Sequence, residues 1–499
     1  AFTLAACAAA LATAAAASAT PRFGVAEDAT KYADDGGASL YPKLTALGMD
    51  TNRMSVRWDP ADPTTIQERG FLDRALPAAA QAGIHVILAV YPSDRYAFTA
   101  GSPELRATLF GAYLQTLARR YPQVTDFIVG NEPNERYFWR PQFGPGKRQV
   151  SAAAFLRMMT AAYDALKSVD PKLRVIAAGP SNEGNDKTST SPMRFIAALG
   201  DAYRESARST PFMDAMGFHI YPRNNTHPPS KRYSWPNIGP SDLARVKQAV
   251  WDAFADTPQP TFAQSVFSSE GSLGLVVDEF GWQVAIGPRL AARYTKKENV
   301  PTITEAEQAE YYSRLIRTFA CDIAVTDALI FHLVDEADLK RFQSGLLRIN
   351  RSKRPAYGAV AKAIRTAGAC GSRANWKPAR GVIGAKAIFE TQDHPADRTH
   401  FGISVAASED AVAKAGIFRT SGPGTRPQPG EVARSLAASS GELTPALRVA
   451  RTVKAGYTPR IEFRGSLEPG HYVYGVHLRA AVKPGRTRTF LSSTFEIQP

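Results

Sequence analysis

Short apolar runs of strand length alternate with longer stretches of helical periodicity along the chain as far as Cys370. Eight such runs occur, within residues 22–28, 51–58, 85–92, 126–133, 174–184, 213–222, 273–282 and 328–336, and a helical stretch follows each. This alternation predicts βα units built on a parallel sheet. Eight consecutive units over this length are typical of a closed (β/α)8 TIM barrel, which we predict for residues 20–370.

An open, doubly wound sheet is the alternative interpretation of the same alternation. Such sheets commonly bind nucleotides through a glycine-rich loop after a strand. No loop of this kind follows any of the eight predicted strands. The sequence therefore favours the closed barrel and gives little support to nucleotide binding.

Beyond residue 370 the pattern changes to an alternation of apolar and polar residues with a period of two. Runs of this kind lie at 385–390, 400–407, 460–465, 471–479 and 488–497, and a segment rich in Gly and Pro lies at 421–430. Such runs between turns predict a small antiparallel β-sandwich, an accessory domain over residues 371–499. The expected fold class is therefore α/β, a TIM barrel followed by an all-β sandwich domain.

The basic charge of the chain is strongest in this C-terminal part. The formal net charge is +14, and the residues after Cys370 include 18 basic against 10 acidic side chains. A basic excess attracts anionic partners without specifying them. We therefore interpret this domain as a structural companion of the barrel, with an electrostatic association with an anionic cell-wall polymer as the alternative. No nucleic-acid-binding motif accompanies the charge, and no nucleic acid is expected as a partner.

Residues 1–19 form an alanine-rich apolar run that ends in Ala17-Ser18-Ala19. This small-x-small pattern is typical of a signal-peptide cleavage site, and we interpret the run as a signal peptide without its basic start. The prediction is a secreted, extracellular protein, which we expect to be a monomer. Residues 4–7 also resemble a lipoprotein box, so a lipid anchor through Cys7 is the alternative. No later apolar stretch is long enough for a transmembrane segment.

Two cysteines, Cys321 and Cys370, remain if the signal peptide is removed. In an oxidising compartment a disulfide between them is expected, and it would stabilise the fold by about 2–4 kcal/mol. Two buried thiols are the alternative. Two cysteines without a histidine-rich neighbourhood do not predict a zinc site.

Two glutamates mark the ends of the fourth and seventh predicted strands. Glu132 lies in VGNEPNE and Glu279 in LVVDEFGWQ. The carboxyl ends of all strands of a TIM barrel meet at one rim, where such barrels keep their chemistry. Hydrolysis of a glycosidic bond needs one carboxyl group as an acid and a second as an anion or nucleophile. We therefore predict that Glu132 and Glu279 are a catalytic pair.

These motifs resemble those of the glycoside hydrolases of clan A, including the family 5 cellulase-like and family 39-like enzymes. Asn131-Glu132 matches the pair that ends the fourth strand in that clan, and Glu279 within DEFGW matches the nucleophile that ends the seventh. The resemblance covers about residues 22–366. It implies a retaining mechanism with Glu132 as acid/base and Glu279 as nucleophile, and it requires neither a metal nor an organic cofactor.

The resemblance also implies roles for four further residues. Asn131 would hydrogen-bond the sugar 2-hydroxyl. His219 and Tyr221, in GFHIYP, match the clan's His-x-Tyr, with Tyr221 orienting the nucleophile. Arg57, in SVRW, matches an arginine that pairs with the nucleophile. For each residue the structural alternative is ordinary packing or a structural ion pair at a strand end.

Several aromatic residues bear on the substrate. Trp282 follows the predicted nucleophile by three residues and is the strongest candidate for stacking on a pyranose ring. Trp58, Trp139 and Trp235 are weaker candidates near the same rim. Where many family 5 members have a histidine and a tryptophan, this chain has Tyr91 and the pair Phe331-His332. These departures leave the sugar and the exact family open.

The sequence as a whole predicts a secreted retaining O-glycosyl hydrolase that acts on a polysaccharide or oligosaccharide. The alternative is a non-catalytic polysaccharide- or cell-wall-binding protein built on a hydrolase-like barrel. Such a protein would keep an aromatic cleft without activating either glutamate. The intact motifs around Glu132 and Glu279 favour the enzyme.

Overall fold

The computed structural model describes most of the chain. The described residues are 20–98, 102–206, 208–234, 236–254, 257–262, 273–368, 370, 376, 385–390, 398–407, 410–437, 443–454, 458–481 and 487–499. The predicted signal peptide, with Cys7, lies outside them. Among the described residues, no helix has both the length and the apolar character needed to cross a bilayer.

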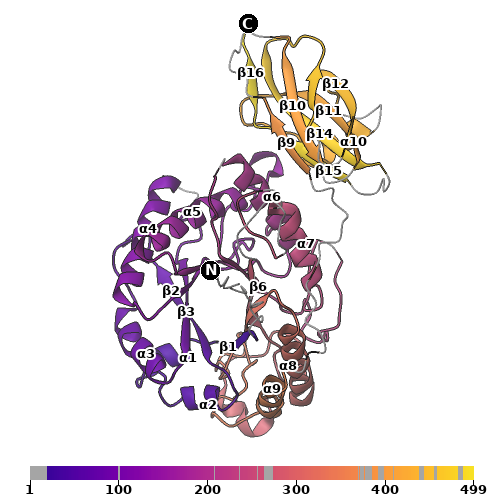
Figure 1. Ribbon diagram of the computed structural model, residues 1–499. Helices are drawn as coiled ribbons and strands as arrows, with labels where there is room; N and C mark the ends of the chain where they lie inside the picture. The colour runs from indigo at the N-terminus through magenta and orange to yellow at the C-terminus, as the bar shows by residue number, and fades with distance from the viewer. Residues whose placement is uncertain are drawn as a thin grey trace, which may run out of the picture.

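Eight parallel strands close into a barrel in the order of the sequence, which confirms the predicted TIM barrel (Figure 1). The strands are β1 (Arg22–Ala26), β2 (Thr51–Trp58), β3 (His85–Pro92), β4 (Asp126–Val129), β5 (Arg174–Ala177), β6 (Ala215–His219), β7 (Gly274–Phe280) and β8 (Val325–Ile330). Strand β8 pairs with β1 through Arg22↔Asp327 to Val25↔Ile330, and this pairing closes the ring. The carboxyl ends of all eight strands therefore share one rim.

Helices surround the strands and bury an apolar layer between themselves and the barrel. They are α1 (Ala29–Tyr32), α2 (Tyr41–Thr45), α3 (Arg69–Gln81), α4 (Pro103–Arg120), α5 (Ser151–Val169), α6 (Pro192–Glu205), α7 (Leu243–Phe254), α8 (Glu305–Ala320) and α9 (Pro355–Arg365), with short 3-10 turns η1 (Pro145–Lys147) and η2 (Pro288–Arg293). Proline begins α4, α6 and α9, where its missing N–H costs nothing. Thr304 and Glu307 form a capping box that begins α8.

Four charged side chains fill the opposite end of the barrel, where β1, β4, β5 and β8 begin. Arg22 lies 2.5 Å from Asp126 and 2.7 Å from Asp327. Arg174 lies 3.1 Å from Asp126 and 2.7 Å from Asp327. The two arginines balance the two buried carboxylates and close this end with a polar network. Polar groups at this face of a TIM barrel serve stability, whereas the chemistry belongs to the other rim.

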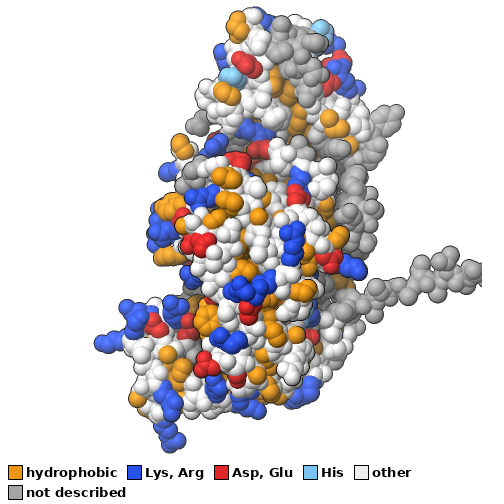
Figure 2. All heavy atoms as spheres, turned by 90° about the vertical axis from the view of Figure 1, so that its left-hand side faces the viewer, with side chains coloured by type: hydrophobic (Ala, Val, Ile, Leu, Met, Phe, Trp, Pro, Cys, Tyr) orange, Lys and Arg blue, Asp and Glu red, His pale blue; other side chains and the backbone are white. Residues whose placement is uncertain are grey.

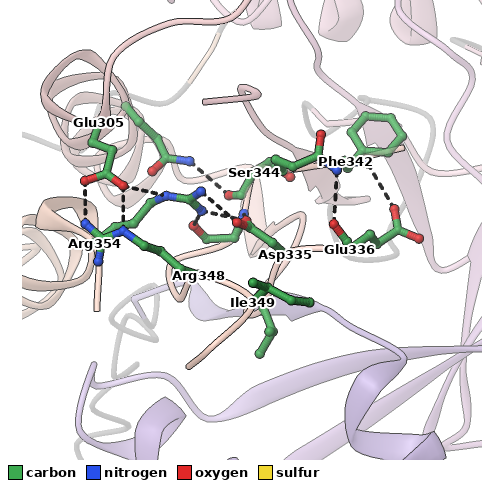
Figure 3. Close-up of polar contacts among 12 residues, drawn as sticks. Glu305, Asp335, Glu336, Phe342, Ser344, Arg348, Ile349 and Arg354 are labelled. Atoms are coloured by element: carbon green, nitrogen blue, oxygen red, sulfur yellow. Dashed lines mark hydrogen bonds and ion pairs between the residues drawn. The ribbon is translucent and has the colours of Figure 1, made fainter. Parts of the chain in front are cut away.

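The segment between β8 and α9 is held in place by a buried ion pair (Figure 3). Arg354 donates to both carboxylate oxygens of Asp335 at 2.6 and 2.7 Å, and both side chains are almost fully buried. Glu305, at the start of α8, accepts from Arg354 at 3.2 Å and from Arg348 at 2.8 and 2.6 Å. Asp335 also accepts from the Tyr294 hydroxyl at 2.6 Å. These contacts tie the last loop of the rim to the outer helices.

The C-terminal part forms a β-sandwich with antiparallel strand pairing, as predicted. Its strands are β9 (Ala385–Phe389), β10 (Phe401–Ala407), β11 (Ala411–Thr420), β12 (Leu447–Val453), β13 (Arg460–Phe463), β14 (Gly470–Ala480), β15 (Thr487–Leu491) and β16 (Phe495–Ile497). One sheet has the order β13-β10-β9 and the other β12-β11-β14-β15, with β16 paired to β14. Buried side chains of both sheets, including Ile403, Ile461, Ile417 and Val476, share one core.

A short helix and one ion pair complete this domain. Helix α10 (Pro429–Ala437) packs Val432 and Leu436 against Phe418 and Val473 on the outer face of the larger sheet. Arg426 forms an ion pair with Glu205 of α6, so the domain contacts the barrel at that helix (Figure 1). On the face shown in Figure 2, Lys and Arg side chains are interspersed with Asp and Glu.

A disulfide joins Cys321, which ends α8, to Cys370, beyond α9. The prediction that these two cysteines pair is confirmed. The disulfide links the two ends of the segment that contains β8 and α9, the last βα unit of the barrel.

Candidate active site

The barrel brings Glu132 and Glu279 to one place on the rim. Glu132 follows the end of β4, Glu279 is the penultimate residue of β7, and His219 ends β6 between them. The His219 Nδ1 atom lies 2.7 Å from Glu132 Oε1 and 3.4 Å from Glu279 Oε2. Because both distances share one atom, these two oxygens cannot be farther apart than the two distances taken together. The two predicted catalytic carboxyl groups therefore face each other.

A sharp backbone turn presents Glu132 to this site. Gly130 has φ 97° and Glu132 has φ 36°, both in the left-handed region. A side chain at residue 130 would meet Phe155, Ala178 and Met158 at 3.1–3.2 Å, so only glycine suits this position. Glutamate has no such freedom, and a left-handed residue of this kind costs about 1–3 kcal/mol. Strain of this kind is often found at functional sites because the surrounding structure enforces it.

The loop after β4 is fixed by a buried amide. Asn134 donates through Nδ2 to the Thr190 carbonyl at 2.9 Å, and its Oδ1 accepts from the Ser181 N–H at 2.7 Å. Both partners lie in the loop after β5. These bonds hold the loop that carries Glu132 to its neighbour on the rim.

Two donors orient the carboxylate of Glu279. Arg53 of β2 donates from Nη1 to Oε1 at 2.8 Å, and Tyr221 donates its hydroxyl to Oε2 at 2.8 Å. Arg53 also donates from Nη2 to Asn131 Oδ1 at 3.0 Å. The bond from a guanidinium to a carboxylate is charge-assisted and therefore among the stronger hydrogen bonds in proteins. Asn131, Tyr221 and Glu279 thus lie in one hydrogen-bonded group with Arg53.

His219 is a buried cation between acidic groups. Its Nε2 lies 3.2 Å from Asp278 Oδ2, while its Nδ1 contacts Glu132. Burial alone would lower the pKa of His219, but the charges of Glu279 and Asp278 and the hydrogen bonds to Asp278 and Glu132 outweigh burial and raise it well above its usual value. The ring is therefore an imidazolium that donates from both nitrogens.

Asp278 contacts both cations of the site, His219 and Arg53. It is fully buried, and its Oδ2 lies 3.9 Å from Arg53 Nε in addition to the contact with His219. Burial alone would raise the pKa of Asp278, but the charges of His219 and Arg53 outweigh burial and lower it. Asp278 was not predicted as a site residue. Its place directly before Glu279 in the DEFGW motif is the sequence signal that could have indicated it.

The prediction that Arg57 pairs with Glu279 is wrong, because Arg53 takes that place. Arg57 is exposed, and its guanidinium lies 5.8 Å from the centre of the Tyr91 ring. Strand β1 ends at Ala26, which pairs with Arg53, so Arg57 lies beyond the end of β1. Arg53 and Arg57 lie on the same face of β2, four residues apart. Only the register between the strands determines which of them lies at the height of Glu279.

The prediction that Trp282 offers an exposed face to a sugar is also wrong. Its side chain is fully buried, and its Nε1 donates to the His227 carbonyl at 2.9 Å. The indole packs against Tyr311 and Tyr312 of α8. Trp58 and Trp139 are buried as well, and Trp235 lies outside the described residues. The tryptophans at 58, 139 and 282 therefore serve packing.

Aromatic side chains from the β8 loop form a wall beside Glu279. The Tyr221 ring lies 6.1 Å from Phe331 and 5.7 Å from Phe342, and Phe331 and Phe342 pack edge-on at 4.8 Å. His332 donates from Nδ1 to the Ala26 carbonyl at 2.8 Å, and its Nε2 lies 3.7 Å from Glu336. The wall replaces the tryptophan platform that the resemblance would suggest.

His332 is a second imidazolium at this rim. Burial alone would lower its pKa, but the carboxylates of Glu27 and Glu336 outweigh burial and raise it to about 9. Glu27 directly follows β1 and accepts from the N–H groups of Leu333 and Val334, each at 2.9 Å. The cluster therefore joins the first and last strands of the barrel. Among the described residues, no group of three or more His, Cys, Asp or Glu side chains is placed to hold a metal ion.

Comparison with known proteins gives matches among solved structures alone. No family model matches the chain, and no curated protein does. A family 39 glycoside hydrolase from Bacteroides cellulosilyticus WH2 is 15% identical, with a TM-score of 0.48, covering 89% of this chain and 81% of its own. GH5_18 from Streptomyces cattleya is 18% identical, with a TM-score of 0.47, covering 70% of this chain and 81% of its own.

A monomeric beta-xylosidase from Caulobacter crescentus CB15 is 14% identical, with a TM-score of 0.44, covering 93% of this chain and 96% of its own. These three solved structures are thus glycoside hydrolases. Because their TM-scores lie below 0.5 and their sequence identities are low, we draw no argument from them about activity or substrate. The strand pairing itself establishes the barrel.

Proposed function

We propose that this protein is a secreted retaining glycoside hydrolase with a polysaccharide or oligosaccharide substrate. The observation that carries the proposal is the single His219 ring nitrogen within 2.7 Å of Glu132 and 3.4 Å of Glu279. Two carboxyl groups that face each other at the catalytic rim of a TIM barrel supply the acid and the anion that glycosidic hydrolysis needs. The disulfide supports export, because disulfides persist in oxidising compartments.

The two glutamates have different surroundings, and this difference supports different roles. Glu279 accepts from Arg53 and Tyr221, so both of its oxygens are oriented for attack. Glu132 accepts one bond, from His219 to Oε1, and its Oε2 has no hydrogen-bond partner in the described part of the chain. Oε2 is therefore the oxygen that can carry a proton toward a substrate. This supports Glu279 as nucleophile and Glu132 as acid/base.

The reaction then proceeds in two displacements. A Glu279 oxygen bonds to the anomeric carbon as the glycosidic C–O bond breaks, and the Glu132 proton passes to the departing oxygen. Glu132 next takes a proton from water, the water oxygen attacks the anomeric carbon, and the bond to Glu279 breaks. One water is consumed, and Glu132 is protonated again at the end.

The close approach of one oxygen of Glu132 to one oxygen of Glu279 supports retention. Retaining enzymes place their carboxyl groups about 5–5.5 Å apart, whereas inverting enzymes need about 6.5–9.5 Å to admit a water. The Glu132 and Glu279 oxygens that face His219 lie 2.7 and 3.4 Å from the same nitrogen, and their separation cannot exceed these two distances combined. This limit applies to that one pair of oxygens, and it is compatible with the short separation of a retaining pair.

Single substitutions test the two roles separately. We expect Glu279→Ala to lower kcat by about 10⁴-fold or more, because no other group can form the covalent intermediate. Glu132→Ala should lower kcat by about 10²–10⁴-fold on substrates with poor leaving groups, and much less on activated aryl glycosides, which need little acid assistance. Release of sugars and aryl groups from a broad panel of glycans and aryl glycosides is the measurement.

Azide identifies which glutamate has been removed, because a small anion can occupy the space that the lost carboxyl group leaves. Azide should give a glycosyl azide of inverted configuration with Glu279→Ala and of retained configuration with Glu132→Ala. Glu104→Gln, on the exposed outer face of α4, is the control and should leave all rates unchanged. If the wild-type protein binds glycans but releases no sugar or aryl group from any substrate of the panel, the proposed hydrolysis is contradicted.

A further inference from the structure

A hollow of about 500 Å³ lies beside Glu132 on the same rim. The loops after β4, β5 and β6 line it, through Glu135, Arg136, Tyr137, Glu183, Gly184, Asn185, Thr188, Ser189 and Arg223. Its volume falls within the range of pockets that take small molecules. None of its lining residues belongs to the group around Glu279.

The hollow adjoins the acid/base rather than the nucleophile. Glu135 donates its N–H to the Glu132 carbonyl at 2.8 Å, so the two residues share one turn. Burial raises the pKa of Glu135, and the charges of Glu132 and Glu183 add to this effect. In the proposed mechanism Glu132 gives its proton to the departing oxygen, so the leaving group must lie on the side of Glu132. The hollow borders the turn that carries Glu132, through Glu135.

Charges of both signs line the hollow in equal number. Arg223 Nε lies 3.0 Å from Glu183 Oε2, and both side chains remain well exposed. Glu135 accepts from the Ser189 hydroxyl at 2.7 Å. Arg136 stands over the Tyr137 ring with its guanidinium carbon 5.0 Å from the ring centre. Two carboxylates and two guanidiniums give no net charge, and together they offer both acceptors and donors.

This chemistry matches a neutral sugar ring. Each hydroxyl of a pyranose can donate and accept, so it suits a site with carboxylates and guanidiniums side by side. Tyr137 is 65% exposed and supplies an aromatic surface of the kind on which the apolar face of a sugar packs. A charged sugar would meet one repulsive pair of side chains, and an alkyl or aryl group would form no hydrogen bonds with these polar groups.

We propose that this hollow is a leaving-group subsite that binds a neutral, hydroxyl-rich pyranose, with Arg223, Glu183 and Tyr137 as its specificity-determining residues. The proposal rests on the proposed glycosidase function. It makes the enzyme selective for oligosaccharides over glycosides whose leaving group lacks hydroxyls. Binding energy from this sugar would favour its oligosaccharide substrates in kcat/KM.

Two substrates with the same glycone separate this subsite from the catalytic pair. One is the 4-nitrophenyl glycoside, and the other is a neutral disaccharide with the same non-reducing sugar. We expect Arg223→Ala and Tyr137→Ala each to lower kcat/KM for the disaccharide by about tenfold or more and to change the aryl glycoside less than about twofold. The matched control is Arg69→Ala, which breaks an exposed Arg–Asp pair on the outer helix α3 and should change neither substrate.

The outcomes are distinct. A selective loss on the disaccharide, with an unchanged melting temperature, supports the subsite. Equal losses on both substrates, or no loss on either, would overturn the subsite while leaving the hydrolase intact. If the wild-type protein cleaves neither an aryl glycoside nor an oligosaccharide from a broad panel, the proposed function fails, and the subsite fails with it.

Discussion

The site contains three acidic groups and two cations at close range. Arg53 and His219 lie among Glu132, Asp278 and Glu279, so full ionisation of all three carboxyl groups leaves one unit of negative charge in excess. Protonation of one carboxyl group makes the cluster neutral. Glu132 and Asp278 each accept one side-chain hydrogen bond, from His219, whereas Glu279 accepts two. Of the three, Glu132, with a side chain 16% exposed, has the best access to substrate. At the scale of single residues, access to substrate thus favours Glu132 as the group that acts on the leaving oxygen in the proposed mechanism.

Asp278→Asn tests whether the imidazolium positions Glu132. Asp278 is one of the charges that raise the pKa of His219, so its removal lowers that pKa. The imidazolium then loses its proton at a lower pH, and with it the hydrogen bond to Glu132. We expect the alkaline limb of the kcat/KM profile to move to lower pH and kcat at the optimum to fall by up to about 10²-fold.

The control for Asp278→Asn is Asp322→Asn. Asp322 forms an ion pair with Lys247 of α7, outside the ring of strands, and its loss should leave the pH profile unchanged. Steady-state kinetics from pH 5 to pH 10 gives both profiles. An alkaline limb that does not move in Asp278→Asn would show that His219 takes no part in positioning Glu132.

At the scale of elements, the barrel supplies each functional side chain from a different strand. Arg53 comes from β2, Glu132 from the end of β4, His219 from β6 and Glu279 from β7. Parallel strands in a closed ring bring these residues to one rim, although they are far apart in sequence. The last loop of that rim is fixed by the Asp335–Arg354 pair (Figure 3). Phe331 and Phe342 of this loop therefore keep their places against Tyr221.

Arg354→Ala tests this anchoring pair. Loss of the guanidinium leaves Asp335 buried without its counter-ion, and breaking a buried pair in this way costs about 3–5 kcal/mol. Arg348→Ala is the matched control, since Arg348 contacts the same Glu305 but is partly exposed, and it should cost about 1 kcal/mol or less.

Urea unfolding followed by tryptophan fluorescence gives the free energy of unfolding of the barrel. This probe suits the barrel because the chain has no tryptophan after Trp376. If Arg354→Ala and Arg348→Ala lower the free energy of unfolding equally, the buried Asp335–Arg354 pair does not anchor the loop more strongly than an exposed pair would.

At the scale of the whole molecule, two domains with separate cores are joined near the disulfide. The cysteines are separated by 49 residues, a span that contains β8 and α9. A cross-link over a loop of this length restricts the unfolded chain and stabilises the folded one by about 2–4 kcal/mol. The sandwich has its own core and does not depend on this bond.

Replacement of both cysteines by serine should therefore destabilise the barrel and leave the sandwich unaffected. Differential scanning calorimetry of the full chain, with and without reductant, is the measurement. The oxidised wild type should show a barrel transition several degrees above that of the Cys321→Ser/Cys370→Ser variant, and reductant should abolish the difference. Coincident transitions in the absence of reductant would contradict a stabilising bridge.

The sequence by itself determined the strands and helices and the strand ends at which the candidate catalytic residues lie. Apolar periodicity is a local property, so it located eight strands, the change to a β-sandwich after residue 370, and the strand ends that carry Glu132, His219 and Glu279. Residue parity within a strand is also local. It does not distinguish Arg53 from Arg57 on β2, and it was the resemblance that placed Tyr221 beside Glu279 and assigned the arginine to Arg57.

Only the tertiary structure decided how high each side chain lies along the barrel and which side chains it contacts. Arg53 lies beside Glu279 because the stagger of β1 against β2 sets the height of each β2 residue, and no local pattern encodes that stagger. Trp282 is buried because α8 places Tyr311 and Tyr312 against it. Asp278 contacts His219 because β6 and β7 pair in the barrel. These outcomes depend on contacts between distant segments, which exist only when the ring of strands is closed.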